Sequence, residues 1–314
     1  MNNKTAHLGY LITFSLLVSA TSFANEAYKE EVSLQWTTED IENQGTDYIE
    51  NDIFELTGKI YFSPVENRDH PLAEAAYLQR VGSVAIAGYR QKNVYNLSTV
   101  SPLFFDEESV TRGGAIQATY MQPDKPFMFQ ASYQSDTTDA EDQIMNTLYE
   151  YEEESSGYGI SLGYFLSDSF LLGISYGDYE TTFDKAPPLL PENDETTETR
   201  GLYLKYVDKT ASGDAFNIES GIIYYAEDDS IDTEKYRRMS LAGDYYPNQA
   251  FSIGVEYNRY EFNQSNANVD STGVRSTYFI SPMYAVSLAY SETDYGASTI
   301  DGQKEYTVGL SARF

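Results

Sequence analysis

Residues 52–63 read Asp-Ile-Phe-Glu-Leu-Thr-Gly-Lys-Ile-Tyr-Phe-Ser, and the character of their side chains alternates. In an extended strand, one face would carry Phe54, Leu56, Gly58, Ile60 and Phe62, and the other Glu55, Thr57 and Lys59. A period of two is the signature of a β-strand that has one apolar and one polar face. The stretch decides the fold class because the same pattern recurs from one end of the chain to the other.

The alternating segments are similar in length. They lie at 28–36, 81–90, 111–121, 127–135, 156–166, 169–180, 198–208, 214–226, 235–246, 250–262, 271–280, 283–295 and 303–314. Most have about the 9–11 residues that a tilted strand needs to cross a bilayer. The pattern predicts an all-β fold of about 14 strands, with 12 or 16 left open because boundaries are hard to place.

The connections between these segments alternate in length. The short ones are 122–126, 167–168, 209–213, 247–249 and 281–282, and the long ones are 37–51, 91–110, 136–155 and 181–197. One connection on the short side, Pro64 to Arg80, is long, and its residues 71–78 are compatible with about two helical turns. Short turns that alternate with long loops are typical of an outer-membrane barrel. The alternative is a soluble sandwich, but only a closed antiparallel transmembrane β-barrel leaves no sheet edge unpaired in lipid.

The composition fits a barrel in lipid better than a soluble protein. The chain has 29 Tyr and 16 Phe but a negative mean hydropathy. A barrel in lipid needs apolar residues only at alternate positions, with aromatic residues at the two interfaces. The net charge of −29 argues against nucleic-acid partners, and the absence of Cys excludes a disulfide framework and thiolate chemistry.

The first 24 residues predict a secretory signal peptide. Lys4 is followed by an apolar stretch, Leu8 to Ala20, and then by Ser22-Phe23-Ala24, which suits a cleavage site. A retained membrane anchor is the alternative, but no stop-transfer pattern follows. We therefore expect a single barrel domain at 25–314, exported through the periplasm to the cell outer membrane of a Gram-negative bacterium.

The last strand, Tyr306-Thr-Val-Gly-Leu-Ser-Ala-Arg-Phe314, ends the chain on an aromatic residue. It resembles the C-terminal assembly signal of outer-membrane barrels, with Gly309, Ala312 and Phe314 at the matching positions. The resemblance implies recognition by the barrel-assembly machinery. The unpaired edge of such a strand can add to another sheet.

Residues 58–65 and 71–78, Gly-Lys-Ile-Tyr-Phe-Ser-Pro-Val and Pro-Leu-Ala-Glu-Ala-Ala-Tyr-Leu, resemble the general bacterial porin family. The match is most specific over about 30 residues around these two stretches. It implies passive diffusion of small hydrophilic solutes through the barrel. It also implies outer-membrane lipid and lipopolysaccharide as surroundings, and leaves a homotrimer open.

Charged residues on the polar parity of the strands are the candidate pore lining. They are Glu55, Lys59, Lys205, Glu219, Arg238, Asp244, Glu256, Arg275 and Arg313. The predicted loops 37–51, 136–155 and 227–234 are acidic and contain no base. Carboxylates at the mouth of a pore concentrate cations, so we expect a cation-leaning channel. A solvated loop surface is an equal alternative.

The predicted loop 136–155 is the candidate for a constriction that folds into the lumen, and an outward flap is the alternative. Its acidic residues are Asp136, Asp139, Glu141, Asp142, Glu152, Glu153 and Glu154. A second hypothesis for the whole protein is a closed barrel that acts through its acidic loops as an adhesin or a structural surface protein. A third, weaker one is an outer-membrane hydrolase.

Residues for an enzyme are scarce. After the signal segment the only His is His70, whose neighbours Arg68, Asp69 and Pro71 are typical of a turn, and a Ser–His–carboxylate triad would have to use it. No Cys/His cluster suits zinc, and the spaced acids do not match a calcium loop. The sequence therefore predicts no catalytic residue, no metal site and no cofactor.

Overall fold

The computed structural model describes residues 27–43, 48–67, 70–96, 105–144, 147–184, 195–210, 214–228, 233–262, 268–296 and 300–314. The predicted signal peptide lies outside these residues. The described chain forms fourteen strands and one short helical segment. The strands are β1 (Ala27–Asn43), β2 (Tyr48–Glu66), β3 (Ser83–Asn96), β4 (Phe105–Met121), β5 (Phe127–Ile144), β6 (Thr147–Phe165), β7 (Phe170–Asp184), β8 (Glu195–Lys209), β9 (Ala215–Asp228), β10 (Thr233–Asn248), β11 (Phe251–Phe262), β12 (Asn268–Ser281), β13 (Tyr284–Asp294) and β14 (Ile300–Arg313).

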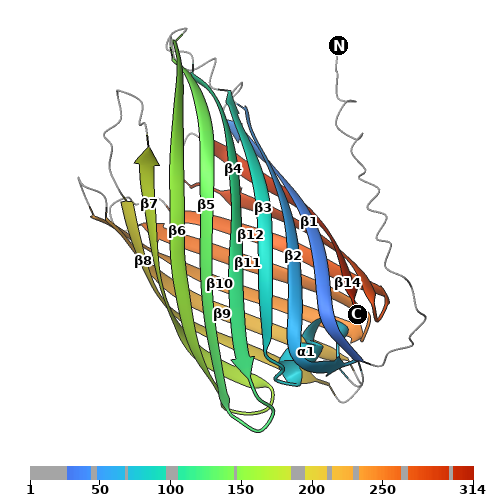
Figure 1. Cartoon of the computed structure of the whole chain (residues 1–314). Helices are drawn as coiled ribbons and strands as arrows, with labels where there is room; N and C mark the ends of the chain where they lie inside the picture. The colour runs from blue at the N-terminus through green and yellow to red at the C-terminus, as the bar shows by residue number, and fades with distance from the viewer. Residues whose placement is uncertain are drawn as a thin grey trace, which may run out of the picture.

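The strands close into one antiparallel barrel, in which each strand pairs with its neighbours in the chain and β1 pairs with β14 (Figure 1). At this seam Leu34 lies opposite Leu310. The last residue continues the seam, because the carbonyl oxygen of Phe314 accepts the N–H groups of Lys29 at 2.6 Å and Glu30 at 3.0 Å. The predicted closed barrel of about 14 strands is confirmed.

The outer face of the barrel is apolar. On β2, the large side chains of Phe54, Leu56, Ile60 and Phe62 are each more than 40% exposed, whereas Tyr61 between them is only 5% exposed. The other strands repeat this alternation, so the apolar parity of the sequence faces outward around the barrel. No helix in the described parts of the chain is both long enough and apolar enough to span a membrane.

The strands are longer than the sequence predicts. β5 has 18 residues and β6 has 19, so the described parts of 136–155 continue the barrel wall and the prediction of a loop there is wrong. The predicted loops 37–51, 91–110, 181–197 and 227–234 are shortened in the same way. Beyond the apolar band both faces are polar, so hydrophobic alternation stops although backbone pairing continues.

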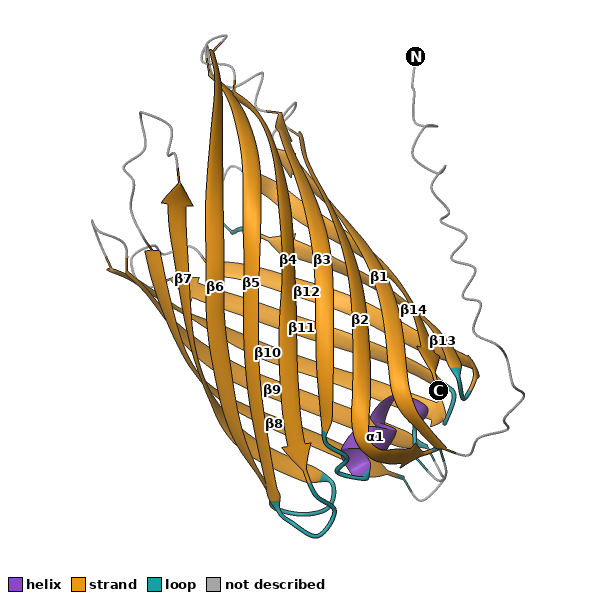
Figure 2. Ribbon diagram, in the orientation of Figure 1, coloured by secondary structure: helices purple, strands orange, loops and turns teal. Residues whose placement is uncertain are grey.

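The connections predicted as short turns, 122–126, 167–168, 209–213, 247–249 and 281–282, all lie at one end of the barrel, and the helical segment lies at the same end (Figure 2). It consists of a 3-10 turn, η1 (Leu72–Glu74), followed directly by α1 (Ala75–Leu78). The prediction of about two helical turns in 71–78 is confirmed. Residues 70–82, called the mouth segment below, connect β2 to β3.

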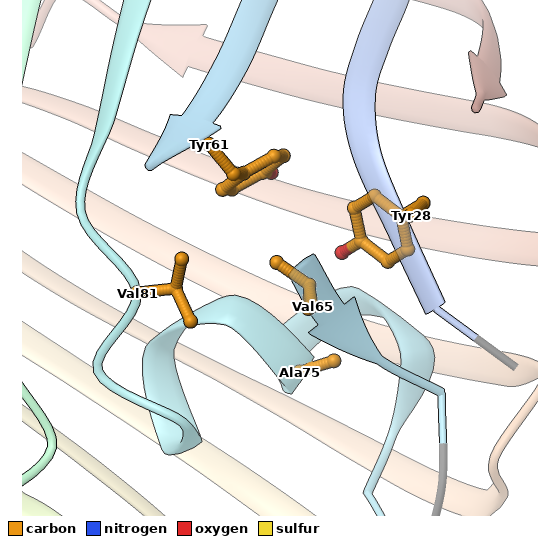
Figure 3. Packing of buried hydrophobic residues seen from close by; sticks show 5 residues of the cluster. All are labelled: Tyr28, Tyr61, Val65, Ala75 and Val81. Carbon is orange, nitrogen blue, oxygen red and sulfur yellow. The ribbon is translucent and has the colours of Figure 1, made fainter. Parts of the chain in front are cut away.

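A small apolar core fixes this end. Ala75 and Val81 of the mouth segment pack against Val65 of β2, together with Tyr28 and Tyr61 (Figure 3). Ala75 and Val65 are fully buried, and the two tyrosine rings meet edge to face with centroids 5.4 Å apart. The helical segment is therefore packed against the wall and not left as a free loop.

Candidate channel lumen

The strand register places every predicted pore-lining residue on the parity opposite the exposed apolar side chains. Lys205 lies opposite Glu219, Glu219 opposite Ala242, and Gly254 opposite Arg275, each on the inner parity. Glu55, Lys59, Arg238, Asp244, Glu256 and Arg313 also occupy inner positions. Arg200 and Arg259 lie on the outer parity, where Arg200 is 3.0 Å from Glu198 and Arg259 is 3.1 Å from Glu261.

The inner charges of β8 to β12 form a continuous network. Lys205 donates to Glu219 at 2.7 Å, and Asn217 donates to both Glu219, at 3.0 Å, and Asp244, at 3.2 Å. Arg275 then binds Asp244 with two hydrogen bonds of 2.7 and 2.9 Å. Each charge of this network therefore has a partner of opposite charge, whereas the buried Asn217 Oδ1 and Tyr203 hydroxyl have no hydrogen-bond partner among the described residues.

Glu74 of the mouth segment joins this network from inside the barrel. Its carboxylate lies 2.8 Å from the ammonium of Lys205 and accepts the hydroxyl of Tyr246 at 2.9 Å. The Glu74 side chain is only 8% exposed and that of Lys205 only 22%. Because this ion pair is shielded from water, replacing either partner would leave the other as an uncompensated buried charge and would destabilise the protein.

Tyr77 makes a second contact with the same wall. Its hydroxyl shares its one proton between the carbonyl oxygens of Lys205, at 3.3 Å, and Ser169, at 3.4 Å. Burial, with the nearby Glu74 carboxylate, raises the pKa of the Tyr77 phenol above its usual value. The phenol therefore stays protonated and keeps this shared hydrogen bond across the physiological pH range.

The opposite wall holds the mouth segment through Arg313. Its guanidinium donates to the carbonyl oxygen of Leu72 at 2.9 Å and to the carboxylate of Glu31 at 2.8 Å. It also lies 4.6 Å from the ring centroids of Tyr28 and Phe279. The sequence places Arg313 in the pore lining, whereas the structure adds a clamp on the backbone of the mouth segment.

Apolar contacts anchor the mouth segment on three sides of the barrel. Besides the core at β1 and β2, Leu72 packs against Phe279 of β12 and Ala285 of β13. Tyr77 packs against a third cluster on β5, β6 and β7, formed by Met128, Phe165 and Leu171. The segment thus crosses the opening from wall to wall at the end with the short turns (Figure 2).

Arg80 ends the helical segment in an unusual backbone conformation. Its φ is +52°, in the left-handed region that a non-glycine residue rarely adopts. Its buried guanidinium lies 2.9 Å from Asp168 and 4.3 Å from the centroid of the Phe165 ring, and it donates to the Ser167 carbonyl at 3.2 Å. The left-handed backbone conformation costs about 1–3 kcal/mol, and these contacts stabilise it at the edge of the mouth.

Several inner tyrosine rings lie close against the wall over glycines. A Cβ added to Gly173 would meet the ring of Tyr203 at 2.2 Å, and one added to Gly157 would meet the ring of Tyr179 at 2.1 Å. Tyr89 covers Gly113 in the same way and donates to Asp136 at 2.8 Å. These glycines let large rings lie along the wall instead of projecting into the lumen.

The acidic candidates of 136–155 divide between the two faces. Asp136 and Glu153 occupy inner positions of β5 and β6, whereas Asp139, Glu141, Glu152 and Glu154 occupy outer ones. The side chain of Asp142 lies outside the described residues. The prediction that 136–155 folds into the lumen as a constriction is wrong for the described residues, because they pair as strands of the wall. The segment that crosses the opening is residues 70–82.

The sequence does not single out Glu74, Tyr77 or Tyr246 as functional. Their signal is weak, since a carboxylate within a short helical pattern is usually solvated. His70 lines a groove of about 410 Å³ beside the mouth segment. Among the described residues, no group of three or more His, Cys, Asp or Glu side chains is placed to hold a metal ion.

Comparison with protein families agrees with this architecture. A family model described as "Putative general bacterial porin" matches residues 6–314, almost the whole chain. The chain belongs to this porin family. It is a porin of the Gram-negative outer membrane, surrounded by outer-membrane lipid. No curated protein matches it.

Solved outer-membrane barrels share the fold of this porin. Omp33 of Acinetobacter baumannii is 19% identical, with a TM-score of 0.59 over 92% of this chain and 99% of that one. The monoaromatic hydrocarbon channel CymD is 11% identical, with a TM-score of 0.60 over 91% and 89%. The Pseudomonas putida toluene transporter TodX is 11% identical, with a TM-score of 0.56 over 93% and 90%. At these identities the likeness shows the fold alone.

Proposed function

We propose that this porin is a passive diffusion channel for small hydrophilic solutes, that it favours cations, and that the mouth segment sets its narrowest point. The observation that carries the proposal is a polar inner wall opposite an apolar outer one, with residues 70–82 across the periplasmic opening. Short turns mark the periplasmic end in this class of barrel. A polar wall lowers the free energy of hydrated solutes in the lumen. A fixed segment across the opening limits the size of the solutes that can pass.

The inner surface supports passage of water-soluble molecules. Small side chains occupy inner positions on several strands, and the largest inner rings lie along the wall. The small inner residues are Ala115, Gly159, Ser161, Gly173, Ser175, Ala285 and Ser287. Hydroxyl pairs such as Thr37 with Thr307, at 3.0 Å, and Thr111 with Thr138, at 2.8 Å, add polar groups without charge.

The balance of inner charge supports cation preference. Carboxylates outnumber bases among the described inner positions, and Glu39 of β1 lies directly opposite Glu305 of β14. Like charges in register repel each other, and a passing cation relieves that repulsion. The inner acids are Glu31, Glu39, Glu55, Asp136, Glu153, Glu195, Glu219, Glu227, Asp244, Glu256 and Glu305, and the inner bases are Lys59, Lys205, Lys209, Arg238, Arg275 and Arg313.

Reversal potentials in a planar bilayer under a KCl gradient test this preference. We expect the mature barrel to pass K⁺ more readily than Cl⁻. The double variant Glu39→Gln/Glu305→Gln should lower the permeability ratio about two- to five-fold, because two charges near the path contribute about 0.5 kcal/mol each before screening.

The matched control is Glu152→Gln/Glu154→Gln, which removes the same charge from outer positions of β6. Its permeability ratio should stay close to that of the unmodified barrel. An anion-selective unmodified channel, or an equal loss of selectivity in both double variants, would argue against cation preference arising from the inner wall.

We also propose that the C-terminal strand carries the assembly signal. Gly309 lies on the inner parity of β14, and the backbone of Phe314 pairs with Lys29 and Glu30. This edge stays open until β1 joins it, which suits recognition by strand addition. Assembly into a homotrimer stays a prediction.

A further inference from the structure

Two arginines lie side by side on the outer face of the barrel. Arg90 of β3 pairs in register with Arg112 of β4, and both side chains are exposed. The next residues along the same hydrogen-bonded row are Phe54 and Trp36, which are 41% and 49% exposed. Like charges directly opposite each other destabilise an antiparallel pair unless an anion lies between them.

The row of Arg90 and Arg112 holds two arginines against one carboxylate of the chain, whereas other outer arginines each have a carboxylate partner. Arg237 pairs with Glu261, and Arg200 lies 3.0 Å from Glu198. Arg112 lies 2.6 Å from Asp139, but among the residues that the structure describes Arg90 makes no ion pair. The row at β3 and β4 therefore keeps a positive charge that faces outward.

The height of the pair matches the outer headgroup layer. Tyr120 lies on the outer face of β4 beside the periplasmic turn, and the strand from Tyr120 to Arg112 is about 27 Å long at the usual rise per residue. A tilt of about 40° reduces this to about 21 Å along the membrane normal. The apolar band of such a barrel is about 25 Å tall, so the Cα of Arg112 lies about 4 Å below the outer boundary of the hydrocarbon, and its long side chain spans this gap.

We propose that Arg90 and Arg112 bind a phosphate group of an outer-leaflet glycolipid. Two guanidinium groups on neighbouring strands can both donate to the oxygens of one phosphate, Arg112 through the N–H groups that Asp139 does not use. Trp36 and Phe54 extend the site with aromatic surface at the interface, where the first sugar and acyl carbons of the lipid would lie.

Native mass spectrometry of the folded barrel with diphosphorylated lipid A tests the site. We expect Arg90→Gln/Arg112→Gln to weaken binding about tenfold, as lost charge-assisted hydrogen bonds would. Arg200→Gln is the matched control, because its arginine faces outward but is paired with Glu198, and it should bind like the unmodified barrel. If the double variant fails to fold, the two single variants carry the test, each with about threefold weaker binding.

Two further arms identify the ligand. Dephosphorylated lipid A should bind the unmodified barrel and the double variant equally, since the phosphate is what the arginines recognise. Inorganic phosphate at the same concentration should not displace the lipid. Equal affinity of the unmodified barrel and the double variant for diphosphorylated lipid A would overturn the proposal, and so would displacement by inorganic phosphate.

Discussion

Replacing residues 67–80 with a four-residue Gly-Ser link raises the single-channel conductance of the barrel several-fold. Val65 and Val81 pack together, so a short link can join β2 to residue 81. The exchange removes Leu72, Glu74 and Tyr77, whose contacts carry the mouth segment across the opening. Conductance grows with the area of the narrowest cross-section, and planar-bilayer recordings measure it directly.

A matched exchange separates this effect from a general disturbance of the periplasmic end. The turn between β4 and β5 connects neighbouring strands and does not cross the lumen. Exchanging residues 122–126 for the same link should leave the conductance near that of the unmodified barrel. If removal of 67–80 left the conductance unchanged, the constriction would have to lie elsewhere.

The second large effect is expected from Glu74→Ala. The change leaves Lys205 with Glu219 as its remaining carboxylate partner and removes the acceptor of the Tyr246 hydroxyl. Breaking a buried pair costs about 3–5 kcal/mol, and the retained Glu219 contact reduces the loss to about 2 kcal/mol or more. Amide hydrogen exchange measures this loss of stability at Leu72, whose N–H donates to the carbonyl oxygen of Gln249 at 2.9 Å. That amide should exchange about 30-fold faster.

Glu74→Gln is the control for shape. The amide oxygen can still accept the Tyr246 hydroxyl, so the rate of exchange should fall between those of the unmodified barrel and Glu74→Ala. Amides in the centre of β9 and β10 should not change in either variant, because the wall keeps its backbone pairing. Equal exchange at Leu72 in all three proteins would mean that the ion pair does not hold the mouth segment.

The alternation of apolar and polar side chains was enough to predict the wall of the barrel. Phe54 and Ile60 face outward and Glu55 and Lys59 inward, as a period of two requires, and the strand count follows from repeating this reading. The same parity placed Lys205 and Glu219 on the inner face, and the strand register of the structure then brings them into contact. These features depend on local pattern, which a single sequence contains.

The strand extensions and the mouth could not be predicted this way. Asp136 and Glu153 lie on strands, but residues around them are polar on both faces, so no periodicity marks the pairing. Glu74 meets Lys205 only because the connection folds back into the barrel. That contact spans much of the chain and depends on the shape of the opening. Such contacts follow from the tertiary fold and not from local spacing.

The central claim is that water fills the barrel and lipid surrounds it. The natural chain has no Cys, so single cysteines can be introduced at residues 115–118 of β4 and exposed to a small cationic thiol reagent in lipid vesicles. Positions 115 and 117 lie on the inner parity and 116 and 118 on the outer. We expect rapid labelling at 115 and 117 and almost none at 116 and 118. Labelling without alternation, or labelling confined to 116 and 118, would contradict the account.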